Sequence, residues 1–462
     1  MTAAAGIGTA AARSALLLAA WRGQPSRKRP RWWRLPAVAL AALLLATCSG
    51  DRASMQQSPL LRFVERKSGR IAIMGSDGNI YTMDQAGGAR VPVTEDAVIP
   101  DQERGLVRYY QFPAWSPDDS RLAFIGYQGN DQIAATSSVF TTAPDGTNIV
   151  QAFSSGQYLP HTLYWSPDGR RLTFLTSTAG STASALQIVP AAGGEATKLD
   201  AGNPFYWSWA PDGTTIVVHA GGSGAAFRSR LAFLNVDGAV YEEGLSVRPA
   251  AFQTPAWSPD GSRLLVAAQA GDQAELVMTN REGSLYRVLH RARTAPAFAW
   301  SPDGNRVAYI TRTINEEGVQ ANLQVVDAEE RATEPLVLTE ETLVIGFFWS
   351  PDSEKIAYFV PGTYVNPDNE EQQTLFLTLH VHNLRRDASR EIHRFVPTSQ
   401  FMQVVQQFDQ FYLAARVWSP DSRNLLFAAY SQQGPGIMVA KADSSLAPRR
   451  VADGLIGFWS WH

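Results

Sequence analysis

The pattern of apolar and polar positions repeats along most of this chain. A short apolar run ends in tryptophan, a polar turn of the type Ser-Pro-Asp-Gly follows, and alternating apolar residues come next. Residues 114–125, AWSPDDSRLAFI, and residues 256–267, AWSPDGSRLLVA, show the regular form. The unit occurs seven times, with its tryptophans at Trp115, Trp165, Trp209, Trp257, Trp300, Trp349 and Trp418. Self-similarity at spacings of 43 to 69 residues indicates a repeat architecture.

Each unit contains the signals of four short antiparallel strands. The tryptophan ends the first strand, and Ser-Pro-Asp-Gly has the residue preferences of a type I turn. The apolar alternation after the turn predicts a second strand, as in residues 121–125. A third apolar run, such as residues 323–326, and a Gly-containing hairpin lead to a fourth. Four strands in such a unit predict one blade of an all-β propeller.

The two ends of the chain complete one unit. Residues 70–94 carry the second, third and fourth strands without a tryptophan strand before them, and the C-terminal LIGFWSWH carries a tryptophan strand with nothing after it. We expect the last strand, with Trp461 as the eighth repeat tryptophan, to pair with the first blade and remove both free edges. This predicts eight four-stranded blades with N- and C-terminal strand closure; seven is the alternative if two irregular units merge.

One unit, between Trp349 and Trp418, holds an insertion. The spacing of its apolar residues predicts an amphipathic helix near 397–411, with Thr398 or Ser399 as N-cap. The helix either covers core or forms a lid or docking element over the central channel. The apolar residues concerned are Phe401, Val404, Val405, Phe408 and Phe411.

These repeats resemble the TolB-type, WD-like propeller repeat, whose signature is W-S-P-D-G followed by two residues and an apolar pair. The resemblance covers residues 70–462 and implies the propeller fold. The same repeat occurs in the Tol-system periplasmic protein, in tricorn-type proteins and in the propeller halves of prolyl oligopeptidase-like peptidases. The resemblance therefore specifies the fold better than the function.

The first 47 residues have the pattern of an export signal. Residues 27–34 are basic and aromatic, and residues 35–47 form an apolar stretch that is short for a membrane span. The residues Leu45-Ala46-Thr47-Cys48, which include the only cysteine, resemble a bacterial lipobox. The resemblance implies a lipoprotein-type signal peptide at 1–47 and lipid attachment at Cys48. The polar residues that follow are interpreted as a tether, at 48–68, and the repeats as a propeller at 69–462. An ordinary secretory peptide with an incidental cysteine is the alternative.

The charge balance limits the partners of the propeller. Residues 1–47 hold seven of the 40 Lys and Arg residues and no acid, which leaves 33 basic against 43 acidic residues, a net charge of −10, in the rest. We therefore expect no nucleic-acid partner, and contact with a membrane only through a lipid anchor. A single cysteine excludes an intramolecular disulfide framework.

The sequence contains little that indicates catalysis. Residues 221–225 approach a Gly-x-Ser-x-Gly elbow but fail at the last position, and there is no P-loop or His-Glu-x-x-His motif. His380 and His382 would point to one side of a strand and are weak candidates for a metal site, with His393 or Glu391 as a third ligand. The repeated turn aspartates are interpreted as structural acceptors. No cofactor is expected.

Aromatic and polar residues precede several of the tryptophan strands. In a propeller such segments begin on one face around the channel mouth, and aromatic clusters with few lysines are typical of binding surfaces. The sequence favours a lipid-anchored scaffold outside the cytoplasmic membrane, on the periplasmic side or cell surface, that binds an envelope protein or a small ligand. The alternative is a metal-dependent lyase or a hydrolase with its site in the central channel. The candidate binding residues are Tyr109, Tyr110, Tyr158, His161, Phe205, Tyr206, Phe411 and Tyr412.

Overall fold

The computed structural model describes most of the chain after the predicted export signal. All described residues belong to one compact unit, Ser54–His462. The predicted signal peptide, Cys48 and the tether up to residue 67 lie outside them. The described residues are 68–99, 105, 107–130, 136–221, 229–237, 241–250, 253–315, 318–330, 334–340, 342–366 and 369–462.

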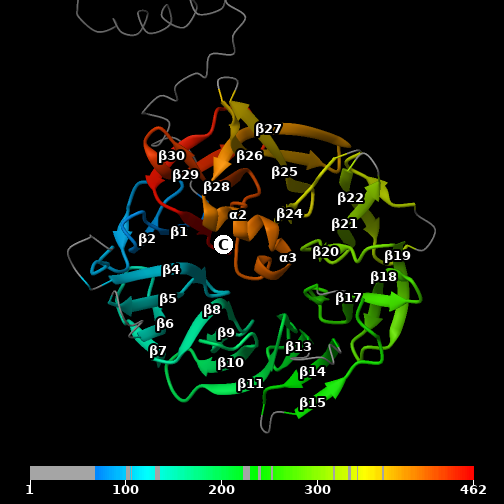
Figure 1. Ribbon diagram of the computed structural model, residues 1–462, viewed down its shortest axis with the longest axis horizontal. Helices are drawn as coiled ribbons and strands as arrows, with labels where there is room; N and C mark the ends of the chain where they lie inside the picture. Colours follow the sequence, from blue (N-terminus) through cyan, green and yellow to red (C-terminus); the bar gives the residue numbers. More distant parts are fainter. Residues whose placement is uncertain are drawn as a thin grey trace, which may run out of the picture. The chain divides into compact units, whose positions relative to one another are not determined.

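The antiparallel sheets of this unit form a ring, and the predicted all-β propeller is confirmed (Figure 1). Each regular sheet follows the chain from one edge to the other, as the repeat unit predicts. The first two of these sheets consist of β4 (Val107–Trp115), β5 (Leu122–Gly129), β6 (Thr136–Thr142) and β7 (Val150–Ser155), and of β8 (Tyr158–Trp165), β9 (Arg171–Thr178), β10 (Ser184–Pro190) and β11 (Thr197–Gly202). The next two consist of β12 (Phe205–Trp209), β13 (Thr215–Ala220), β14 (Arg230–Asn235) and β15 (Tyr241–Gly244), and of β16 (Ala256–Trp257), β17 (Arg263–Ala270), β18 (Gln273–Asn280) and β19 (Leu285–Ala292).

The later part of the chain departs from four strands per sheet. A regular sheet of β20 (Ala297–Trp300), β21 (Arg306–Asn315), β22 (Gly318–Asp327) and β23 (Leu336–Val337) comes first. Then β24 (Gly346–Trp349), β25 (Lys355–Asn366), β26 (Asn369–Asn383), β27 (Ala388–Pro397), β28 (Asn424–Ser431), β29 (Gly434–Lys441) and β30 (Arg449–Asp453) form one sheet. Because β27 pairs with β28, the units of Trp349 and Trp418 share this sheet. The described residues thus contain seven sheets, although the sequence has eight units.

The ring closes through a strand from each end of the chain. The C-terminal β31 (Ile456–Trp459) pairs with β1 (Ile71–Met74), and β2 (Ile80–Met83) and β3 (Val91–Pro92) complete that sheet. The predicted closure is therefore confirmed. The assignment of the eighth repeat tryptophan to Trp461 was wrong, because Trp459 ends the strand opposite Ile71 and Ser460 Oγ accepts the Arg70 N–H at 2.9 Å.

The Ser-Pro-Asp turns are held by one repeated hydrogen-bond arrangement. Ser116 Oγ donates to Asp118 Oδ1 at 2.7 Å and accepts the N–H of Arg121, five residues after the serine, at 2.9 Å. The same bonds recur at Ser258, Asp260 and Arg263. Hydrogen bonds from the Ser258 and Ser262 side chains and backbone lower the pKa of Asp260. These contacts support the structural interpretation of the turn aspartates.

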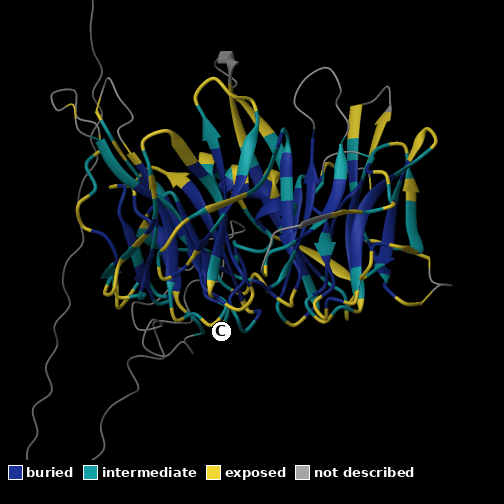
Figure 2. Ribbon diagram, turned by 90° about the horizontal axis from the view of Figure 1, so that it is seen from below, coloured by how far each residue is buried: buried dark blue, intermediate teal, exposed yellow. Residues whose placement is uncertain are grey.

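The tryptophans bind neighbouring sheets together. The indole N–H of Trp165 donates to the carbonyl of Ala114 at 3.0 Å, and that of Trp300 donates to Ala256 at 3.0 Å. Figure 2 shows the buried residues within the sheets and the exposed residues concentrated at the turns. Within the described residues, no helix is both long and apolar enough to cross a membrane.

We predict that Trp257→Ala lowers the free energy of unfolding by about 3–5 kcal/mol, as truncation of buried aromatic residues does. Trp257 is 8% exposed and stacks on Phe233 of the preceding sheet, with ring centroids 5.5 Å apart. Urea denaturation would measure the change. Trp257→Phe keeps a ring in this contact and should lose less; an unchanged unfolding midpoint for the alanine variant would contradict the inter-sheet role.

Candidate functional site

The inserted segment lies inside the ring of inner strands (Figure 1). It forms α2 (Ser399–Gln406) and the one-turn α3 (Phe408–Phe411), and Thr398 is the N-cap, accepting the N–H of Phe401 at 3.2 Å. The apolar spacing in the sequence predicted this helix. We call residues 398–415 the channel plug.

The channel plug is bonded to strands around the ring. The Tyr164 hydroxyl, in β8, donates to the carbonyl of Gln410 and accepts from its side-chain amide. The Thr398 hydroxyl donates to the carbonyl of Leu455, just before β31, at 2.6 Å. Ring contacts add Phe112 with Phe411 (centroids 5.9 Å apart), Phe347 with Phe408 (4.5 Å) and Phe359 with Phe401 (5.7 Å). The helix therefore covers core, and it does so by filling the channel.

Asp409 places a carboxyl group inside the channel. Its Oδ2 accepts the N–H of Thr254, just before β16, at 3.1 Å. The residue is partly buried and lines a small cavity, and desolvation by the surrounding protein raises its pKa although the hydrogen bonds act in the opposite direction. Burial, together with the charge of the same carboxyl, raises the pKa of Tyr206.

Two small cavities flank Tyr412 at the end of the channel where the Ser-Pro-Asp turns lie. Their volumes are about 250 and 210 Å³, and both are lined by Pro259, Tyr412 and Leu413. The Tyr412 hydroxyl donates to the carbonyl of Trp300 at 2.8 Å, and burial raises its pKa to about 12. The hydroxyl therefore stays protonated at neutral pH.

The eight predicted binding residues lie in different surroundings. Phe205 is a core residue at 5% exposure, Phe411 is buried in the channel plug beside Tyr412 in sequence, and Tyr206 lies near Asp409 of the plug. Tyr158, at the start of β8, is 40% exposed. Burial lowers the pKa of His161, on the same strand. Tyr109 stacks on Tyr127 with centroids 5.2 Å apart, whereas Tyr110 faces a groove between two sheets.

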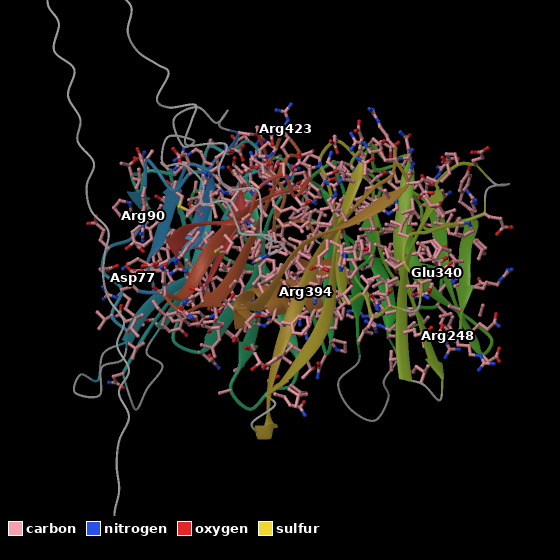
Figure 3. The ribbon with its side chains drawn as sticks, turned by 90° about the horizontal axis from the view of Figure 1, so that it is seen from above. Asp77, Arg90, Arg248, Glu340, Arg394 and Arg423 are labelled. Carbon is pink, nitrogen blue, oxygen red and sulfur yellow. The ribbon has the colours of Figure 1, made fainter. Side chains whose placement is uncertain are left out.

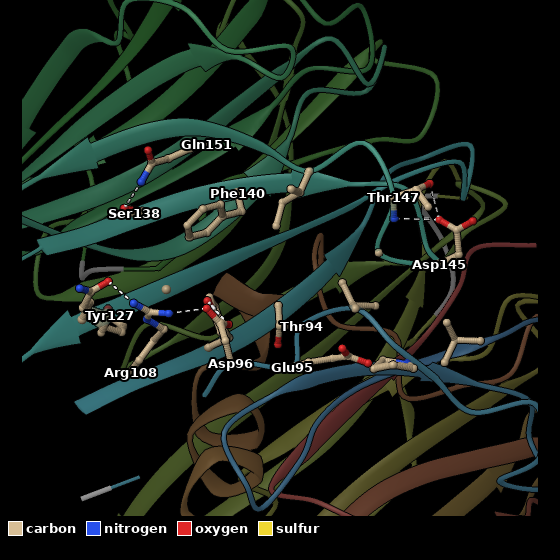
Figure 4. Close-up of a pocket in the computed structure, with 18 of the residues that line it drawn as sticks. Thr94, Glu95, Asp96, Arg108, Tyr127, Ser138, Phe140, Asp145, Thr147 and Gln151 are labelled. Atoms are coloured by element: carbon tan, nitrogen blue, oxygen red, sulfur yellow. Dashed lines mark hydrogen bonds and ion pairs between the residues drawn. The ribbon is translucent and has the colours of Figure 1, made fainter. Parts of the chain in front are cut away.

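This groove, of about 790 Å³, lies between the closing sheet and the sheet of β4 to β7 (Figure 4). The outer strand β3 has only two residues, which leaves the neighbouring strands β6 and β7 uncovered. At Gly126 a Cβ atom would approach Tyr110 to 3.0 Å and Phe140 to 2.8 Å, so the missing side chain lets these rings pack behind the groove. Polar lining residues shown in Figure 4 include Asp96, Arg108, Ser138, Asp145 and Gln151.

The polar groups of the groove are held in place by one another. Asp96 accepts hydrogen bonds from the Tyr110 hydroxyl at 2.8 Å and from the Arg108 guanidinium. Arg108 also donates to the side chain of Gln128 at 3.0 Å, and Gln151 donates to Ser138 at 2.9 Å. Burial and the carboxylate of Asp96 raise the pKa of Tyr110. The groove thus offers fixed donors and acceptors beside aromatic rings, a composition suited to binding.

Of the eight residues that the sequence proposed for binding, only Tyr110 lines this groove. Asp96 lies in a loop with no motif, and Ser138 and Gln151 belong to the third and fourth strands of a unit that is regular in sequence. Their meeting depends on how two sheets pack, which no local pattern reports.

The two weak metal candidates have other contacts. His380 stacks on Tyr358, with centroids 4.9 Å apart, and His382 Nδ1 lies 3.0 Å from Ser389 Oγ. His382 Nε2 lies 3.5 Å from the carboxylate of Asp387. Among the described residues no three His, Cys, Asp or Glu side chains gather as a metal site would require. The pair at 380 and 382 therefore gains no third ligand there.

The central part of the chain matches a known protein family. Residues 108–341, half of the chain, match the family model described as the TolB beta propeller domain. The chain belongs to this TolB propeller family. The match begins at β4 and includes five of the seven repeat tryptophans.

Two curated proteins are similar to parts of this chain. The uncharacterized peptidase YuxL of Bacillus subtilis (strain 168) is 29% identical over 204 residues, which are 43% of this chain and 28% of that protein. The Tol-Pal system protein TolB of Anaeromyxobacter dehalogenans (strain 2CP-C) is 34% identical over 95 residues, 21% of each chain. The chain thus spans between a fifth and a third of the length of these curated relatives.

A solved propeller supports the fold alone. An oligogalacturonate lyase in complex with manganese matches with a TM-score of 0.50 and 15% identity, over 82% of this chain and 98% of the other.

We predict opposite pH dependences for two carboxyl variants. The folded pKa of Asp409 is raised, so the folded protein holds this proton more tightly than the unfolded chain, and stability falls as pH rises from the unfolded value of about 4 to the folded value. Asp409→Asn keeps an oxygen for the Thr254 N–H but cannot ionise. Its melting temperature should therefore rise relative to the unsubstituted protein across this interval.

Asp260→Asn is the matched control. The folded pKa of Asp260 is lowered, so its carboxylate contributes stability that is present above the unfolded pKa and is lost as pH falls through the folded pKa. This variant should lose stability relative to the unsubstituted protein as pH rises. Parallel melting curves for Asp409→Asn and the unsubstituted protein between about pH 3 and 8 would contradict the account of Asp409.

Proposed function

We propose that this protein is a lipid-anchored, extracytoplasmic propeller that binds a protein or ligand of the bacterial cell envelope. The observation that carries the proposal is the placement of the free space: the channel plug fills the axis, while a groove of about 790 Å³ with fixed polar and aromatic groups lies between two sheets. Membership of the TolB propeller family and the relative named as a Tol-Pal system protein support an envelope role.

The channel plug argues against the alternative of an enzyme with its site in the channel. A substrate on the propeller axis would have to occupy space taken by α2 and α3, whose residues Phe401, Val404 and Val405 are fully buried. Displacing them would expose apolar surface worth about 1.5–3 kcal/mol for each side chain. A binding role at the groove requires no such change.

The groove favours a ligand with hydrogen-bonding groups and some positive charge. Its lining includes three carboxylates, those of Glu95, Asp96 and Asp145, and one guanidinium, that of Arg108, which is already paired with Asp96. Aromatic side chains beside fixed polar groups are typical of protein-binding surfaces. A peptide segment carrying Lys or Arg would meet both features.

We predict that Cys48 carries the anchor. Cells grown with an alkyne-bearing fatty acid should label the full chain, and Cys48→Ser should abolish the label and release the protein from the membrane fraction, because the substituted residue has no thiol for lipid attachment. No labelling of the natural chain would contradict lipid attachment, and labelling of the serine variant would place the lipid at a residue other than Cys48.

We predict that a photo-crosslinking residue at position 149 captures a specific partner in cells. Ile149 lines the groove and is 52% exposed, so the replacement should be tolerated. Leu285, at 60% exposure on the outer strand β19 of a distant sheet, is the matched control position. Mass spectrometry should identify a species captured from position 149 and not from position 285; equal capture, or none, would contradict binding at the groove.

A further inference from the structure

A second groove, of about 540 Å³, has the opposite charge to the first. It lies where the units of Trp349 and Trp418 meet, at the end of the propeller that carries the Ser-Pro-Asp turns. Five cationic side chains and one carboxylate line it: Lys355, Arg386, Arg390, Arg423, Lys441 and Asp443. Outside the predicted signal peptide the chain has a net charge of −10, so this local excess of positive charge runs against the composition of the rest.

Much of this positive charge is not neutralised by protein carboxylates. The side chains of Arg386 and Arg423 are exposed, and within the described residues they form no ion pair or hydrogen bond. Arg390 donates to the backbone carbonyl of Asp443, which leaves its charge uncompensated. Lys355, in contrast, pairs with Asp352 at 2.5 Å. Figure 3 shows Arg423 projecting from the ribbon at this end of the propeller.

The backbone keeps these cations close together. β27 pairs with β28 at Val396 and Pro397, so the two units that line the groove are parts of one sheet. The hydroxyl of Ser422, which is 2% exposed, accepts the N–H of Asp352 at 3.0 Å and ties the two Ser-Pro-Asp turns to each other. The groove is therefore formed before any ligand arrives, and the like charges around it repel one another until an anion binds.

We propose that this basic groove binds a phosphate group. Guanidinium groups match the oxygens of a phosphate with paired hydrogen bonds, and the two unpaired arginines and Arg390 supply three of them around one hollow. The Ser422 hydroxyl, which lines the same hollow, offers a further donor. The inference goes beyond the proposed function and does not depend on the lipid anchor.

The phosphate can come from a lipid headgroup or from a soluble compound. The backbone N–H of Asp421, two residues before Arg423, donates to Ser68 Oγ at 3.1 Å. The groove thus lies beside the point where the predicted tether enters the propeller. This position favours a headgroup, and the experiment separates the two sources.

The test measures binding of inorganic phosphate by calorimetry and binding of vesicles by flotation. The vesicles are phosphatidylcholine with and without phosphatidylglycerol, and the full chain carries Cys48→Ser so that no lipid anchor contributes. Arg423→Gln and Arg386→Gln should each weaken the observed binding about tenfold. Arg170→Gln is the matched control, because Arg170 holds the same place in its repeat unit as Arg423 and is beside Asp168.

Each outcome decides the proposal. Phosphate binding that only the two groove variants weaken supports a soluble source, and binding confined to phosphatidylglycerol vesicles with the same dependence supports a headgroup. No binding of either probe, or equal weakening by Arg170→Gln, would overturn the proposal. The test uses the Cys48→Ser variant, so a negative result would not bear on the proposed lipid anchor or on binding at the groove near Tyr110.

Discussion

The pairing of β31 with β1 is the contact on which the rest of the structure depends. Residues Ile456–Trp459 and Ile71–Met74 are separated by almost the whole chain, yet they form adjacent strands with a continuous register. Without this pairing the closing sheet would lose its inner strand, and the ring would have two open edges. The closing sheet also includes β3, and the residues of β3 and of the segment after it form one wall of the groove that contains Tyr110.

The channel plug is the second constraint. It fills the axis of the ring with aromatic and aliphatic side chains and bonds to strands of several sheets, from Tyr164 to Leu455. With the plug in place, the two largest of the hollows described above lie away from the axis. The two grooves differ in charge because different segments line them: Glu95 and Asp96 after β3 in one case, and cations of the last two tryptophan units, among them Arg386 and Arg423, in the other.

The predictions succeeded where a local pattern had a single physical solution. The turn at Ser116 to Arg121, the strands after it and the helix capped by Thr398 all follow from residue preferences and spacing, and the structure confirms them. The choice of Trp461 as the last repeat tryptophan was wrong. The repeat motif begins with Trp-Ser, which Trp459 and Ser460 match and Trp461 does not, and the pairing of Trp459 with Ile71 agrees with that motif. Likewise Phe205 and Tyr206 are neighbours in an aromatic segment, but alternation along β12 makes one core and leaves the other partly exposed.

The sequence by itself determined the repeat unit, the propeller class and the closure of the ring, because each depends on residues that are close in the chain or on two ends with complementary patterns. Only the tertiary structure decided that the inserted helix fills the channel, that the last two units share one sheet, that Asp96 bonds to Tyr110, and that Arg386 and Arg423 line one groove. These features depend on which segments meet in the folded chain, and no periodicity in the sequence reports those meetings. Function in a propeller belongs to such junctions, which is why the fold could be inferred more fully than the site.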